Sequence, residues 1–292
     1  MSNLSHESFS TLKESDAEIL RRIDGDQTLL MEYKKLKETS LGQFLIKNRG
    51  LNGLWTDRVV NYNLISKHER NKYSNYDKYL LGLMPCFIAT QERFGFFKRE
   101  LERLATKYKL KALSAPSGLL PEFYNIESSR IITLDALDID EINHEYISDK
   151  YKSNPLLNKI NFINSNIFSF NRENYYDVIV SNGLNIYIED VFIIEKMYKI
   201  FYSSLNVGGT LITSFLTPPP SLTSEGEVWE MSKINQDNLN KQKLIFGDIL
   251  NISWFNYRSE NEFLDILKNI GFINIRVIWD QQKMFPTVIA IK

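Results

Sequence analysis

The sequence predicts an α/β fold in which a seven-stranded, mostly parallel sheet ends in an antiparallel hairpin and follows an N-terminal helical cap. From about Ser15 to Lys107, apolar residues recur at a spacing of three to four, which is typical of amphipathic helices. From Leu110 onward, short runs rich in β-branched residues alternate with stretches of helical length, as in a parallel sheet with crossover helices. We therefore divide the chain into a cap, residues 1–106, and a sheet domain, residues 107–292.

The last two apolar runs are separated only by residues 280–286, too few for a crossover helix, so they are expected to pair antiparallel. In the connecting segments we expect a helix that begins near Leu119, a helix from Glu141 capped by Asp140, and helices over Asp190–Leu205 and Glu260–Ile270. The expected strands are Leu110–Ala115, Ile132–Ile139, Ile160–Asn164, Tyr176–Ser181, Gly209–Phe215, Ile273–Trp279 and Thr287–Ile291.

The composition is that of a globular protein, with 43% hydrophobic and 24% charged residues among 292. A formal net charge of -1 gives no overall positive field, so we expect neither a nucleic-acid nor a membrane partner. Cys86 is the only cysteine and the histidines are isolated, which predicts no disulfide and no metal site. Neither Met1–Thr11 nor the apolar run Leu80–Ala89 fits a leader or a membrane span, so a cytoplasmic location is expected.

Small and polar residues follow four predicted strands, at the edge where the carboxyl ends of parallel strands meet. Ligands of open α/β sheets bind in the crevice at this edge. Small residues after the first strand let a ligand approach the backbone, and an acid about 20 residues later, Asp138, suits the two hydroxyls of a ribose. Each segment alone could be an ordinary turn, helix cap or loop. Because all four are expected at the same edge of the sheet, ligand binding is the favoured interpretation. The segments are Ser114-Ala115-Pro116-Ser117-Gly118, Asp138-Ile139, Asn166-Ile167 and Ser181-Asn182-Gly183.

From about Lys107 to Lys292 the sequence resembles the class I S-adenosylmethionine-dependent methyltransferases. Asp138 falls on the family's ribose-binding acid, Asn166 on its adenine-contacting residue, and Asn206-Val-Gly-Gly-Thr-Leu on the turn before its fifth strand. Of the glycine-rich first loop only Gly118 is retained, and Ser114 stands where the family has an acid. More narrowly, the sequence looks like a bacterial group with Pro-Cys-Gly in the first loop and Ser-Asn-Gly-Leu-Asn after the fourth strand. The resemblance implies a Rossmann-like methyltransferase sheet and S-adenosyl-L-methionine as the cofactor.

The expected function is methyl transfer from S-adenosylmethionine to a small molecule or an exposed protein group. The four strand-end segments are expected to bind the cofactor. The resemblance also assigns the cofactor carboxylate to Arg93, for which an ion pair with Glu92 or a neighbouring acid is an equal alternative. Asn185 and Tyr187 are candidates for positioning the reacting groups. The candidates for contact with the substrate are Trp55, Trp229, Tyr257 and Arg258. Trp55 could instead pack in the cap core, and Tyr257 and Arg258 could pack on the sheet face.

Two other classes of function remain open at this point. An NAD-dependent oxidoreductase would also use a β-α-β unit with a ribose-binding acid, although the sequence contains no G-x-G-x-x-G. A chain that has lost glycines of the first loop could also bind the nucleoside, or a partner protein, without catalysis.

Overall fold

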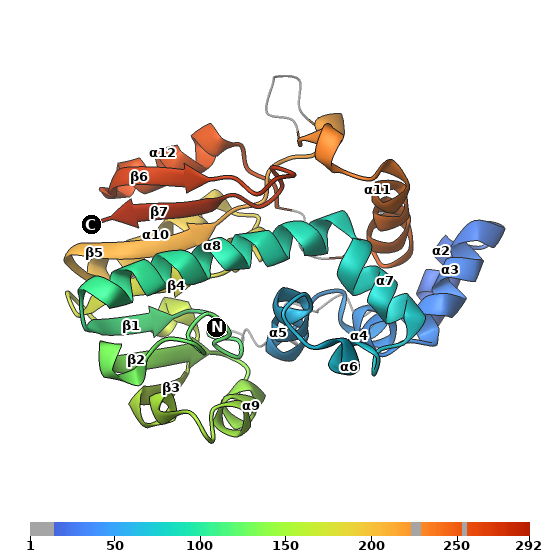
Figure 1. Ribbon diagram of the computed structural model, residues 1–292. Helices are drawn as coiled ribbons and strands as arrows, with labels where there is room; N and C mark the ends of the chain where they lie inside the picture. The colour runs from blue at the N-terminus through green and yellow to red at the C-terminus, as the bar shows by residue number, and fades with distance from the viewer. Residues whose placement is uncertain (1–14, 223–228, 253–255) are drawn as a thin grey trace.

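Seven strands form one sheet in the order β3-β2-β1-β4-β5-β7-β6, as the computed structural model shows (Figure 1). Strands β1 to β5 are parallel to one another, and β7 pairs antiparallel with both β5 and β6. The structure describes residues 15–222, 229–252 and 256–292. The predicted sheet and its terminal hairpin are therefore confirmed. The strands are β1 Leu110–Ser114, β2 Ile131–Asp138, β3 Ile160–Asn164, β4 Tyr176–Ser181, β5 Leu205–Ser214, β6 Ile273–Ile278 and β7 Thr287–Ile291.

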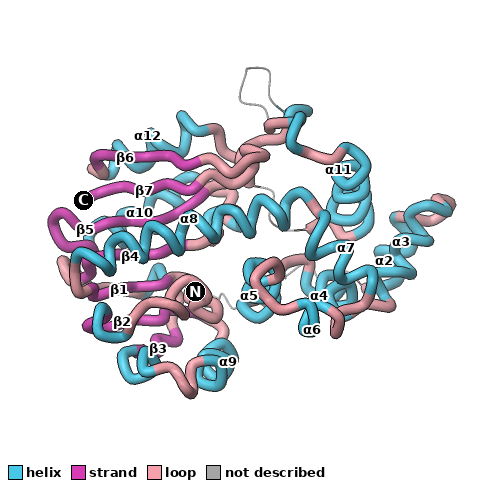
Figure 2. The backbone as a smooth tube through the Cα atoms, viewed as in Figure 1, coloured by secondary structure: helices cyan, strands magenta, loops and turns pink. Residues whose placement is uncertain are grey.

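Helices make up the described chain before β1 and connect most of the strands after it (Figure 2). The α-helices are α2 Asp16–Arg22, α3 Gln27–Lys37, α4 Ser40–Asn48, α5 Gly53–Asn61, α6 Lys67–Arg70, α7 Asn75–Leu83, α8 Pro85–Lys107, α9 Ile142–Lys150, α10 Val191–Ser204, α11 Gln236–Gln242 and α12 Glu260–Ile270. The 3₁₀ helices are η1 Ser128–Arg130, η2 Pro155–Lys159, η3 Ile167–Ser169, η4 Asn185–Tyr187, η5 Pro220–Leu222 and η6 Met231–Lys233, and a π-helix, η7, spans Lys243–Ile249.

The sheet is buried on both faces. Successive residues of a strand point to opposite sides of the sheet, so a single strand contributes to the core on each side. On β4, Val178 and Val180 join a core with Phe97 and Leu101 of α8, whereas Ile179 joins a second core with α10 and α12. Figure 1 shows α8 crossing one face of the sheet and α10 lying behind it. This double coverage explains why the strands read as continuous apolar runs.

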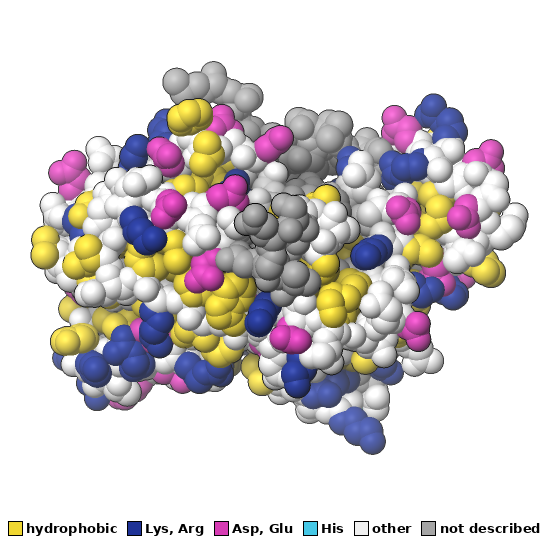
Figure 3. Space-filling view, turned by 90° about the horizontal axis from the view of Figure 1, so that it is seen from above, with side chains coloured by type: hydrophobic (Ala, Val, Ile, Leu, Met, Phe, Trp, Pro, Cys, Tyr) yellow, Lys and Arg dark blue, Asp and Glu magenta, His cyan; other side chains and the backbone are white. Residues whose placement is uncertain are grey.

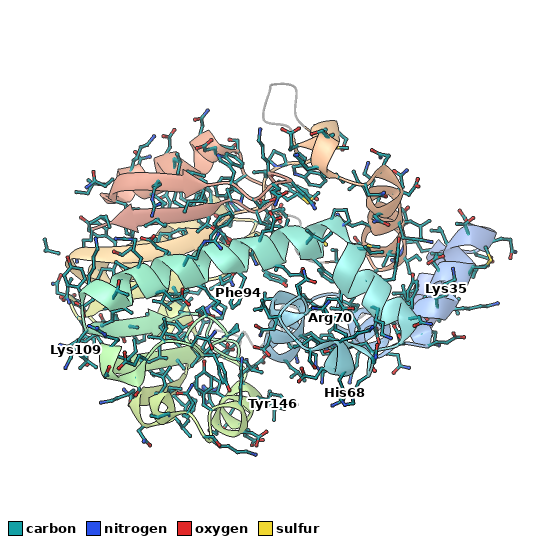
Figure 4. All side chains as sticks on the ribbon, in the orientation of Figure 1. Lys35, His68, Arg70, Phe94, Lys109 and Tyr146 are labelled. Carbon is teal, nitrogen blue, oxygen red and sulfur yellow. The ribbon has the colours of Figure 1, made fainter. Side chains whose placement is uncertain are left out.

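A third core joins the cap helices to a segment that follows β5. Leu36, Leu41 and Leu45 of the cap lie in the same cluster as Ile245 and Ile249 of η7. Figure 4 shows this part of the molecule extending beyond the sheet, with Lys35 at one end of the molecule and Lys109 at the other. The cap is thus built from two regions of the sequence, and the division of the chain between residues 106 and 107 stays a prediction.

The helix predicted to begin near Leu119 is absent, and that prediction is wrong. Residues 119–127 form turns, with Leu120 N–H bonded to Ser117 O and Phe123 N–H bonded to Leu120 O. Leu120 has φ 51, in the left-handed region, and the next residue, Pro121, lacks an N–H. The first loop is therefore followed by turns and does not end at a helix N-terminus.

The helix after β2 also differs from its prediction. It begins at Ile142, and its N-cap residue is Glu141 instead of Asp140; the Glu141 side chain makes no capping hydrogen bond. The third and fourth expected helices are confirmed as α10, capped by Asp190, and α12, which ends at Gly271 with φ 117.

Cationic and anionic side chains are interspersed on the molecular face in Figure 3. Along residues 15–222, 229–252 and 256–292, no helix has both the length and the apolar character that a membrane crossing requires. The predicted absence of a leader in Met1–Thr11 falls outside the described residues.

Candidate functional site

A pocket lies at the carboxyl ends of β1 to β4, where all four predicted segments contribute to its wall. The first residues of α5 and the two residues before them, 51–57, also contribute to the wall and are called the cap turn here. Figure 1 shows α5, which begins in this turn, next to the strand ends. The lining residues are Leu51, Asn52, Gly53, Thr56, Asp57, Pro116, Ser117, Gly118, Leu119, Pro121, Glu122, Leu137, Asp138, Ile139, Asn143, Ser165, Asn166, Ile167, Phe168, Asn182, Gly183, Leu184, Tyr187 and Ile188.

Asp138 fixes the first loop to the end of β2. Its Oδ2 accepts a hydrogen bond from Gly118 N at 2.9 Å, and its Oδ1 accepts one from Asp140 N at 3.0 Å. Each carboxylate oxygen has a second acceptor position. The carboxylate, which is 3% exposed, is therefore held rigidly in the pocket wall with acceptor capacity to spare.

The first loop passes close to the cap at two glycines. Gly118 has φ 46, and a β-carbon there would lie 3.7 Å from Gly53 Cα. Pro116 and Ser117 complete this wall, and the peptide bond between Ala115 and Pro116 is cis. Small residues thus keep the pocket open where the loop and the cap approach each other most closely.

The turn after β4 carries a glycine in a left-handed conformation, Gly183 with φ 80, and lies in front of a buried arginine. A β-carbon at Gly183 would lie 3.7 Å from both Nη1 and Nη2 of Arg93. Arg93 does not itself line the pocket, is 4% exposed, and stacks on the ring of Phe285 at 4.8 Å. Its Nε and Nη1 have no hydrogen-bond partner among the described residues. Burial lowers the pKa of Arg93 to about 10, against the opposing effect of Asp280.

Glu92, the alternative partner of Arg93, instead accepts a hydrogen bond from Gln281 N at 2.8 Å. Tyr187 lines the pocket beside the same turn. Burial raises the pKa of Tyr187 to about 12, while a hydrogen bond from the Leu51 backbone and the charge of Arg93 lower it. The turn after β4 and the cap turn thus meet at Tyr187.

Glu122 is a buried carboxyl group in the pocket wall, 3% exposed. Its Oε1 accepts a hydrogen bond from Ser114 Oγ at 3.0 Å. Burial raises the pKa of Glu122 to about 7, with a smaller contribution from Asp57, and a hydrogen bond from its own backbone N–H, the Ser114 bond and Lys150 oppose the shift. Lys150 forms an ion pair with Asp57, so three titratable side chains gather at the cap side of the pocket.

Two pocket-lining amides carry unused acceptors. Oδ1 of Asn143 and Oδ1 of Asn182 are buried and have no hydrogen-bond partner among the described residues. Asn166 is different, because its Oδ1 accepts from Phe168 N at 2.9 Å and caps η3. The pocket therefore presents unsatisfied hydrogen-bonding groups, which in proteins are usually satisfied by a partner.

The structure places ten of the predicted site residues in the pocket wall and keeps the others behind it or away from it. Ser114 and Ser181 are the last residues of β1 and β4, Ala115 follows β1, and all three are buried and do not line the pocket. Asn185 points under the sheet edge, where its Nδ2 donates to Ser214 O at 2.8 Å. The predicted residues in the wall are Pro116, Ser117, Gly118, Asp138, Ile139, Asn166, Ile167, Asn182, Gly183 and Tyr187.

The four candidates for substrate contact lie outside the pocket wall. Trp55 is 5% exposed in the cap core, and Trp229 lies in the same core with its Nε1 donating to Thr217 Oγ1 at 3.1 Å. Tyr257 packs against that core. Arg258 donates to Ile188 O at 2.6 Å and so braces the turn after β4. The contacts of these four residues therefore favour the alternative role, packing within the protein.

Sequence reasoning missed Asp57, Glu122 and Asn143. Glu122 carried one available signal, because it is an acid in the predicted first loop region, eight positions after Ser114. The other two depend on how α5 and α9 meet across the pocket, which no local pattern shows.

Along almost its whole length the chain is similar to a protein from Bordetella parapertussis described as a possible exported protein. The identity is 28%, the similarity covers 97% of this chain and 98% of that one, and the TM-score is 0.86. It is also similar to the magnesium protoporphyrin IX methyltransferase of Synechocystis with bound S-adenosylhomocysteine, with 14% identity, a TM-score of 0.51, and 70% and 85% of the two chains covered.

No protein-family model matches the sequence, and no curated protein matches it significantly. The strand order, the terminal hairpin and the pocket at the strand ends nevertheless agree with the structural similarity. The chain therefore has the class I S-adenosylmethionine-dependent methyltransferase fold.

Proposed function

We propose that the chain binds S-adenosylmethionine in this pocket and transfers its methyl group to a small molecule or an exposed protein group. The observation that carries the proposal is the fixed Asp138 carboxylate in a pocket built from four consecutive strand ends of a methyltransferase fold. The neighbour from Synechocystis contains S-adenosylhomocysteine, which supports the same class of ligand here.

The residues present fit a nucleoside with an amino-acid tail. The spare acceptor positions of Asp138 suit two ribose hydroxyls, and Ile139, Ile167 and Phe168 offer apolar surface for a base. The unpartnered nitrogens of Arg93 suit a carboxylate that approaches past Gly183, where no side chain intervenes. These residues would hold the cofactor at both of its ends.

The cofactor, when bound, supplies a methyl group on a positively charged sulfur that is displaced in line by a nucleophile. For such a displacement the protein's main contribution is to hold the reacting groups in line, which can lower the barrier by about 7–11 kcal/mol. The cap turn and Tyr187 cover the pocket and restrict the directions from which an acceptor can approach. We therefore propose a small or protruding acceptor and no polynucleotide.

The proposed cofactor also bears on location, because a cytoplasmic enzyme would draw on the cell's own supply of it. We propose that the protein acts in the cytoplasm. Cell fractionation tests this proposal, and recovery of the protein outside the cytoplasm would contradict it.

Calorimetry on the full chain tests the proposed cofactor. We expect S-adenosylhomocysteine to bind with a stoichiometry of one and NAD to show no binding. Binding of NAD alone would favour the oxidoreductase, and binding of neither would refute the proposed site. Incorporation of labelled methyl groups into a mixture of small metabolites then separates an enzyme from a protein that only binds the nucleoside.

A further inference from the structure

The cap side of the pocket is rich in hydrogen-bond acceptors and lacks cations in its wall. Asp57, Glu122 and Asn143 line it, and none of the described lining residues is Lys, Arg or His. Ionised carboxylates only accept hydrogen bonds, and so does an amide oxygen. A ligand that fills this region must therefore bring donors.

The two carboxyl groups are not equivalent. Asp57 forms an ion pair with Lys150, which also donates to Leu119 O at 3.3 Å. Glu122 accepts hydrogen bonds from neutral donors, Ser114 Oγ on Oε1 and its own backbone N–H, although it is only 3% exposed. Burying a charge is costly unless a charged or strongly hydrogen-bonding partner compensates for it. Of the two carboxyl groups on the cap side of the pocket, Glu122 is thus the one without an ion pair among the described residues, whereas Asp57 pairs with Lys150.

A second, independent observation points to a ligand on this side. Asn143 is 2% exposed and its Oδ1 has no partner among the described residues. It lies against Gly53, where a β-carbon would come within 2.5 Å of that oxygen. The cap turn thus approaches the amide without offering it a donor.

We propose that an ammonium group of the bound ligand is held by the Glu122 carboxylate, with Asn143 Oδ1 as a further acceptor for the ligand. The inference rests on the proposed function. The ammonium group has two sources in that reaction, the amino-acid tail of the cofactor or an amine on the methyl acceptor. An ammonium carries three donors and a full positive charge, so it matches both unused groups.

The test uses the full-length Glu122→Gln variant, which keeps the shape of the side chain and an oxygen for Ser114 but removes the charge. Glu102→Gln, at an exposed position of α8, is the matched control. Calorimetry measures binding of S-adenosylhomocysteine and of methylthioadenosine, which lacks the amino-acid tail. Protein saturated with S-adenosylhomocysteine is then titrated with 2-phenylethylamine and with its neutral counterpart 2-phenylethanol.

If the ammonium belongs to the cofactor, the Glu122→Gln variant binds S-adenosylhomocysteine about tenfold or more weakly than the wild type does. Its affinity for methylthioadenosine is then unchanged. If it belongs to the acceptor, both nucleosides bind the variant normally. In that case the wild type binds the amine about tenfold more tightly than the alcohol, and the variant loses this preference. Equal behaviour of the variant and wild type toward all four probes overturns the inference.

Failure of the proposed function looks different, because neither nucleoside would then bind the wild-type protein. If circular dichroism shows that Glu122→Gln is unfolded, Asn143→Leu tests the same contact from the other side of the pocket. This variant should bind S-adenosylhomocysteine more weakly if the ammonium belongs to the cofactor, and 2-phenylethylamine more weakly if it belongs to the acceptor. Unchanged affinity for every probe would overturn the inference.

Discussion

The free energy of unfolding should depend on pH through Glu122, and Glu122→Gln should remove that dependence. Burial raises the pKa of this carboxyl from 4.5 to about 7 in the folded chain. The folded state then holds the proton more tightly than the unfolded state. Stability from this group is therefore fully present below pH 4.5 and is lost as the pH rises through about 7. At 1.36 kcal/mol per pKa unit, the loss amounts to about 3 kcal/mol.

Urea unfolding at pH 5, 6, 7 and 8 measures this effect as the difference between wild type and Glu122→Gln. Between pH 5 and pH 8 the wild type should lose about 2.5 kcal/mol relative to the variant, because at pH 5 part of the effect is already lost. Other carboxyl groups cancel in the difference. If the difference between wild type and Glu122→Gln stays constant within about 0.5 kcal/mol, Glu122 is not a buried group of raised pKa.

Three further results are expected. Asp138→Ala should weaken S-adenosylhomocysteine about 10- to 100-fold, since a hydrogen bond to a charged acceptor is worth about 1.5–3 kcal/mol. Its Kd is the quantity to measure, because losing the bonds from Gly118 N and Asp140 N also lowers stability; an unchanged Kd would remove Asp138 from the site. Gly118→Val should abolish binding and cost about 1–2 kcal/mol of stability, because φ 46 suits glycine, and normal binding would place the ligand elsewhere. A fragment starting at Lys107 should be insoluble, because it exposes the sheet face covered by Phe97 and Leu101; a soluble fragment that binds S-adenosylhomocysteine would contradict this.

Periodicity and turn residues were sufficient to predict that seven strands exist and where they lie. The start of β5 was predicted wrongly, because the strand begins at Leu205 and includes Asn206, which was expected in the preceding turn. The helix expected near Leu119 failed for a local reason. The apolar residues of this segment fit a helix, but Leu120 adopts a left-handed conformation before Pro121. The composition of the segment does not reveal the φ angle of this one residue. The sheet could thus be predicted from the sequence, and the path of the first loop could not.

The pocket was predictable where it follows the strands and unpredictable where it depends on the cap. Asp138 and Gly118 lie at strand ends, whose positions follow from the topology of the sheet. Asp57 and Asn143 come from helices that meet only in the folded chain, so no spacing in the sequence relates them. Trp55 and Trp229, both candidates for contact with the substrate, are packed in the cap core instead.

The cap core has a consequence for how the chain is made. Leu36, Leu41 and Leu45 emerge early in synthesis, but their partners Ile245 and Ile249 are added only after five strands of the sheet have been translated. Until then the nascent helices expose apolar faces that neighbouring chains can bind. Slowed elongation before η7 is translated should therefore lower the yield of soluble protein, and a chaperone that binds the cap helices during this time should raise it. Either intervention should have a smaller effect after η7 has been translated.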